Sequence, residues 1–115
     1  MWLMTKYGFY SIVQKKPGEY HVRSREMKDI ENLVKNVPLP NAEIKDTTGS
    51  DDAARIVVGS DEVLSIIKFL GENIDYNNFK DKIDKIPEQR HKPYHRIWSV
   101  LAEALGAYGK KGKAI

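Results

Sequence analysis

The sequence predicts an α+β fold of two layers, in which helices cover one face of an antiparallel sheet of about four strands. Two early segments rich in β-branched and aromatic residues flank a Pro-Gly turn, which predicts a hairpin. Later segments repeat apolar residues at helical spacing, and the expected elements follow the order ββαββαα. The helices have apolar stripes for only one face, so we expect the other face of the sheet to meet water or a partner.

The N-terminal part is expected to form a hairpin followed by a helix. Residues 2–14 form the first strand, with Gly8 marking a bulge. The turn "KKPGE" at 15–19 leads into a second strand, "EYHVRSRE". Residues 26–36 then predict an amphipathic helix capped by Ser24. Its apolar stripe comprises Ile30, Leu33, Val34 and Val37.

A second hairpin and a second helix follow. Residues 43–47 and 53–58 flank the turn residues "TGSD" and predict the hairpin. Ser60 is expected to cap the next helix, since two acidic residues follow it directly. The buried stripe of this helix is expected to comprise Val63, Ile66, Ile67, Leu70 and Ile74.

The C-terminal part is expected to hold a short helix capped by Asp75 and a last helix over residues 93–105. Proline suits the first helical position, so we expect Pro93 to begin the last helix. We expect a single domain over residues 1–109, followed by a flexible basic tail at 110–115.

A row of basic residues in "EYHVRSRE" is the main functional signal. In a strand, His21, Arg23 and Arg25 lie on one side, and Arg55 of a later strand is expected on the same open face. A ring from the first strand, in either register across Gly8, would lie beside them. Guanidinium groups bind phosphates and rings stack on bases, so this face predicts binding of a single-stranded nucleic acid or another polyanion. The candidate anion-binding residues are Lys6, His21, Arg23, Arg25, Arg55 and Arg96.

Charge is uneven along the chain, which suits such a local surface. The net charge is only +3, yet residues 1–25 hold five lysines or arginines against one glutamate. A local potential steers an anionic partner even when the whole protein is close to neutral. A strongly basic nucleic-acid packing protein is therefore disfavoured.

Three alternatives to nucleic-acid binding stay open at the level of sequence. The first alternative is that the arginines are only solvated or are paired with acidic residues such as Glu43 across the sheet, which is common on the open face of an antiparallel sheet. The same face could pair with a second copy in a homodimer or with an acidic protein. A metal-independent nuclease is the third alternative, with His95 or His21 as the candidate general base. We expect a binding domain rather than an enzyme, and no cofactor.

A second basic stretch, "RHKPYHRIW", places His91 and His95 four residues apart. On a helix this spacing can chelate a metal ion. If Pro93 begins the helix, His91 lies before it and the two rings share no face. We therefore expect no metal site.

The chain contains no cysteine, which excludes disulfides and thiolate ligands. No apolar run approaches the roughly 20 residues that span a bilayer, and the N-terminus resembles a strand more than a signal peptide. These features favour a cytoplasmic protein with no membrane partner.

The motifs "MWLMTKYGFYSIV", "YHVRSRE", "IDYNNFK" and "YHRIW" together resemble a group of small uncharacterised bacterial proteins. The similarity spans almost the whole chain. It implies a compact stand-alone domain and supplies no activity.

Overall fold

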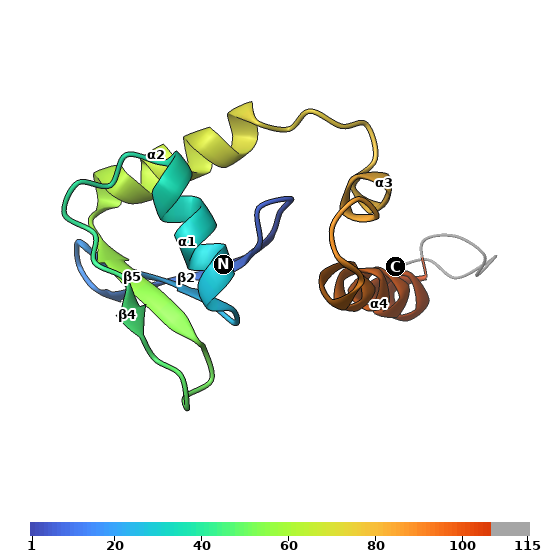
Figure 1. Ribbon diagram of the computed structural model, residues 1–115, viewed down its shortest axis with the longest axis horizontal. Coiled ribbons are helices and arrows are strands. Elements are labelled where there is room, and N and C mark those ends of the chain that lie inside the picture. The colour runs from blue at the N-terminus through green and yellow to red at the C-terminus, as the bar shows by residue number, and fades with distance from the viewer. Residues whose placement is uncertain (107–115) are drawn as a thin grey trace. The chain divides into compact units, whose positions relative to one another are not determined.

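The structure is a computed structural model that describes residues 1–106, apart from the side chains of residues 88 and 89 (Figure 1). The chain divides into two compact units, Met1–Asp75 and Tyr76–Ile115, which are described separately. The described part holds an antiparallel sheet and four helices, which confirms the α+β class. The expected basic tail at 110–115 lies outside the described residues.

The first unit contains a five-stranded antiparallel sheet with the strand order β1-β2-β3-β5-β4. The strands are β1 (Trp2–Met4), β2 (Phe9–Lys16), β3 (Glu19–Ser24), β4 (Lys45–Asp46) and β5 (Ala54–Val58). The prediction of about four strands is close. The additional strand arises because the expected strand at 2–14 folds back on itself.

A turn from Thr5 to Gly8 divides that segment into β1 and β2. The Thr5 hydroxyl donates to the Gly8 carbonyl at 2.8 Å and accepts from the amide of Tyr7 at 3.1 Å. Gly8 lies against Asp29, and a Cβ added at Gly8 would approach Asp29 Cγ to 2.4 Å. The expectation of a bulge at Gly8 was therefore wrong: this glycine closes a hairpin turn where a buried side chain leaves no room for a Cβ.

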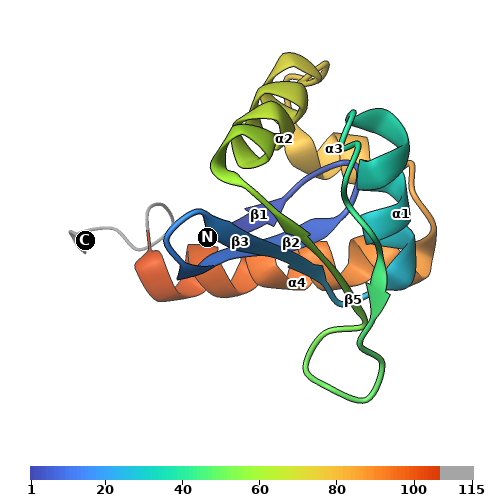
Figure 2. The same cartoon turned by 90° about the vertical axis from the view of Figure 1, so that its left-hand side faces the viewer.

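Two helices, α1 (Met27–Asn36) and α2 (Ser60–Glu72), lie on the same side of the sheet (Figure 2). Their buried side chains form one core with the side chains of one sheet face. The central core residues are Tyr10, Ile12, Val22, Ile30, Leu33, Ile56 and Ile66. Tyr10 and Ile12 therefore point toward the helices, which settles the register that the sequence left open.

The helix caps differ from those expected. Glu26 is the N-cap of α1, and the Ser24 hydroxyl instead donates to the Glu26 carbonyl. Gly59 is the N-cap of α2, where the Glu62 carboxylate accepts a hydrogen bond from the Gly59 amide at 3.0 Å. That side chain performs the capping that was expected of Ser60.

The second unit contains α3 (Phe79–Ile83) and α4 (Glu88–Leu105). The rings of Phe79 and Tyr94 stack with centroids 6.2 Å apart, and Ile83 is buried. The N-cap of α3 is Asn78 rather than Asp75, since the Asn78 side chain accepts a hydrogen bond from the Asp81 amide. None of the described helices is long and apolar enough to cross a bilayer.

The expected start of the last helix at Pro93 was wrong. The helix begins five residues earlier, after Pro87, whose carbonyl accepts from the amides of Arg90 at 2.9 Å and His91 at 3.2 Å. Pro93 lies inside α4, where it removes one backbone donor without ending the helix. His91 and His95 are consequently four residues apart on one helix.

Candidate functional site

The strand register aligns five side chains in one row across the whole sheet. Trp2 pairs with Ser11, Ser11 with Arg23, Arg23 with Arg55, and Arg55 with Lys45. Directly paired residues of antiparallel strands project to the same face, about 5 Å apart at their Cβ atoms. We call this set the cross-strand row. It combines an aromatic ring, a hydroxyl and three cationic side chains.

The cross-strand row lies on the sheet face opposite α1 and α2. Residues that alternate with it along the strands, such as Tyr10, Val22 and Ile56, belong to the core under those helices. Neither helix of the first unit therefore covers the row. We call this side of the sheet the arginine face.

Arg55 is already neutralised by an acidic neighbour. Its Nη2 donates to both carboxylate oxygens of Asp52, at 3.0 and 3.1 Å, and its Nη1 donates to Nδ1 of His21 at 3.3 Å. Nε2 of His21 lies 3.4 Å from a carboxylate oxygen of Glu19. Both imidazole nitrogens of His21 are thus occupied, which leaves neither free to serve as a general base.

Arg23 is in a different situation. Its guanidinium donates to the Ser11 hydroxyl at 3.3 Å and forms no ion pair within residues 1–106. Like charges placed directly opposite in a sheet are unfavourable, and Arg23 stands opposite Arg55. The row therefore leaves one arginine without a carboxylate partner beside a second cation.

A pocket of about 130 Å³ opens on the arginine face beside Arg23. Two rings, those of Trp2 and Phe9, line it together with Arg23 and Arg25. The rings meet edge to face, with centroids 5.8 Å apart, and Trp2 is 74% exposed. Arg25 donates to the backbone carbonyl of Asp51 at 3.0 Å.

The pocket also carries acidic groups. Asp51 and Asp52 line it, and the latter is paired with Arg55. Because the charge of Asp52 is cancelled by Arg55, the remaining charged groups of the pocket are the two arginines, Arg23 and Arg25, and one carboxylate, that of Asp51. The pocket can therefore offer guanidinium donors, an exposed ring and a carboxylate acceptor to one ligand.

The structure brings together only part of the predicted anion-binding set. Arg23 and Arg25 share the pocket, while His21 and Arg55 lie on the same face bound to acidic neighbours. Lys6 lies in the β1–β2 turn, where its ammonium is 3.0 Å from Asp75.

The two remaining candidates, Arg96 and His95, belong to the second unit. Arg96 is an exposed residue of α4. His95 is hydrogen-bonded to Asp84 at 2.6 Å on the same unit. Neither contributes to the pocket, all of whose lining residues belong to the first unit.

Sequence reasoning missed Trp2, Lys45 and Asp52 as parts of this site. Trp2 was assigned to a strand without a partner, and the alignment of Lys45 depends on a register between distant segments. Asp52 had a local signal, since it lies three residues before Arg55 in a turn-to-strand segment.

No protein-family model matches this chain, and no curated protein or solved structure shows significant similarity to it. The function must therefore be argued from the geometry of the site.

Proposed function

We propose that this protein binds single-stranded nucleic acid through the arginine face, with one base held in the pocket lined by Trp2, Phe9, Arg23 and Arg25. The observation that carries the proposal is that one pocket is lined by an exposed tryptophan and by an arginine that has no carboxylate partner within the described residues. Stacking of a base on the ring and binding of the adjacent phosphate by the guanidinium would use both groups at once.

Pocket size favours one part of a nucleotide, such as its base, over a whole drug-sized ligand. Sites for drug-sized molecules enclose about 300–1,000 Å³. The pocket here holds about 130 Å³, so the rest of a strand would lie outside it. The cross-strand row leads from the pocket past the Arg55–Asp52 pair to Lys45, which gives the backbone of the strand one further cation.

The carboxylates around the pocket favour single strands over a simple polyanion. An acidic side chain repels a polyanion, but Asp51 can accept a hydrogen bond from the amino group of a base. A heparin-like ligand would gain nothing from Trp2 or Asp51. We therefore expect bases to add affinity beyond that of the phosphates.

Fluorescence of Trp2 tests the proposal directly. The chain has two tryptophans, so a Trp98→Phe variant leaves Trp2 as the only one. We expect a short single-stranded oligonucleotide to quench this fluorescence at low salt, and a polyphosphate chain of similar charge to quench it much less. In the same background, Arg23→Ala should weaken binding and reduce the slope of log K against log salt by about 0.7.

Lys28→Ala is the matched control, because Lys28 is an exposed cation on α1, the helix that packs on the opposite face of the sheet. It removes the same charge and should leave affinity and quenching almost unchanged. Equal losses from Arg23→Ala and Lys28→Ala would show that binding is nonspecific. Absence of quenching by any oligonucleotide at low salt would refute the proposal.

A further inference from the structure

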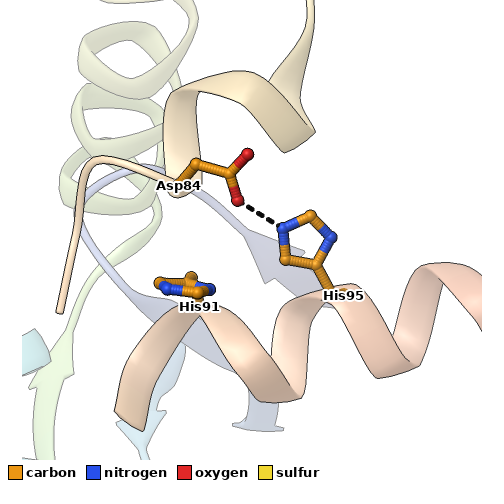
Figure 3. A group of neighbouring side chains, drawn as sticks. All are labelled: Asp84, His91 and His95. Atoms are coloured by element: carbon orange, nitrogen blue, oxygen red, sulfur yellow. Dashed lines mark hydrogen bonds and ion pairs between the residues drawn. The ribbon is translucent and has the colours of Figure 1, made fainter. Parts of the chain in front are cut away.

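The second unit gathers three potential metal ligands. His91 and His95 project from successive turns of α4 toward Asp84, which follows the last turn of α3 (Figure 3). One ligand atom from each residue lies within 4.8 Å of the other two. The rings of the two histidines are 5.7 Å apart and almost perpendicular, with an interplanar angle of 87°.

The local fold explains why these side chains converge. Asp84 is the C-cap that directly follows α3, and three residues separate it from the start of α4. The stacked rings of Phe79 and Tyr94 hold the two helices together. A second contact joins the same helices, since the Lys80 ammonium lies 3.8 Å from the centre of the Trp98 ring. Packing between α3 and α4 thus places the backbone of Asp84 beside the histidine pair.

One contact in the cluster is already made. Nε2 of His95 donates to Oδ1 of Asp84 at 2.6 Å. The other histidine is less well satisfied, because Nδ1 of His91 is buried and has no hydrogen-bond partner within residues 1–106. An imidazole nitrogen left in this state is suited to a ligand that accepts its lone pair.

We propose that Asp84, His91 and His95 bind a divalent transition-metal ion of the zinc class. Two imidazoles and one carboxylate form a ligand set that zinc uses where a fourth position stays open to water or substrate. Imidazole ligands also select this class of ion over magnesium and calcium, which prefer oxygen ligands.

The geometry requires only side-chain adjustment. Metal–ligand distances of about 2.0–2.1 Å in a tetrahedral site place ligand atoms roughly 3.3 Å apart. The Asp84–His95 contact must lengthen from 2.6 Å as the metal replaces the shared proton. The ligand nitrogen of His91, which lies within 4.8 Å of the other two ligand atoms, must move closer to them. Asp84 is exposed, so its carboxylate is free to rotate.

Titration of the untagged full chain with Co²⁺, followed by displacement with Zn²⁺, tests the site. We expect the visible absorption of four-coordinate Co²⁺ to saturate at one equivalent and to disappear when Zn²⁺ is added. Replacement of His91 or His95 by Ala should lower the affinity by at least about tenfold, since even indirect partners of a metal contribute that much. Alanine favours helix, so these variants should keep the far-ultraviolet circular dichroism of the parent.

The third histidine of the chain supplies the matched control. His21 lies in β3 of the first unit, and His21→Ala should bind Co²⁺ as the parent does. Loss of binding only in the variants of Asp84, His91 and His95 would support the site. Undiminished binding in His95→Ala, or no saturable Co²⁺ spectrum in the parent, would overturn the proposal.

Discussion

Replacing Gly8 with alanine should destabilise the first unit more than the same replacement at any of its other glycines. The new Cβ would lie 2.4 Å from Cγ and 2.7 Å from Oδ1 of Asp29. Asp29 is only 3% exposed, and its Oδ2 accepts a hydrogen bond from the Phe9 amide at 3.0 Å. The carboxylate must either stay in a strained contact, at about 1–3 kcal/mol, or move and give up a charge-assisted hydrogen bond, at about 1.5–3 kcal/mol.

Either route predicts a loss of about 1–3 kcal/mol in the free energy of unfolding, and hence a decrease in Tm of roughly 4–24 °C for a domain of this size. Urea and thermal unfolding followed by circular dichroism measure this loss. Gly71→Ala is the matched control, because no heavy atom lies within 4 Å of its added Cβ in α2. We expect that variant to gain up to about 1 kcal/mol from helix propensity. A Gly8→Ala protein as stable as the parent would refute the assigned packing of the turn against α1.

Three further predictions address other parts of the molecule. Tyr10→Phe should lower the free energy of unfolding by about 1 kcal/mol in urea titrations, because the buried Tyr10 hydroxyl donates to the Asp29 carbonyl at 2.8 Å; an unchanged midpoint would contradict this. The hydroxyl and amide of Thr48 lower the pKa of Asp46, so the stabilisation is present above the ordinary carboxyl pKa and is lost as the pH falls through the lowered value. Thr48→Val should raise this pKa in carboxyl NMR titrations, and a pKa that stays low would exclude the hydroxyl as the main cause. Light scattering should give 13.2 kDa if the arginine face is reserved for nucleic acid, whereas twice that mass at every salt concentration would favour the homodimer alternative.

The helices of the first unit were largely predictable because their apolar spacing is a local property of the sequence. Ile30 and Leu33 were expected in the stripe of α1, and both are fully buried. In α2 the central Ile66 is buried as expected, but Ile67 is 37% exposed and Ile74, just past the end of the helix, is 62% exposed. A helical stripe shows which residues can face a core, while tertiary packing decides how many of them do.

The site was harder to predict because its members are joined by pairing between distant strands. The alternation of His21, Arg23 and Arg25 placed them on one side of a strand, yet nothing local to that segment specified Arg55 as the partner of Arg23.

The histidine pair was missed for a different reason, because two prolines compete to begin the last helix. Pro93 is a good first helical residue, and a helix that starts there separates His91 from His95. The structure instead begins α4 directly after Pro87, and Pro93 is tolerated within its second turn. The spacing of the two histidines therefore did place them one helical turn apart, and the wrong helix boundary hid this.

The arginine face and the core depend on the same strand register. Side chains alternate between the two faces of a strand, so the pairing that buries Tyr10 against the helices also places Ser11 beside Arg23 and opposite Trp2. A slip of one residue between β1 and β2 would turn Trp2 toward the helices and remove the ring from the pocket. The Thr5–Gly8 turn sets this register and is held against α1 by the Phe9–Asp29 hydrogen bond. Packing on the helical side of the sheet therefore positions the groups that we propose bind a nucleotide on the other.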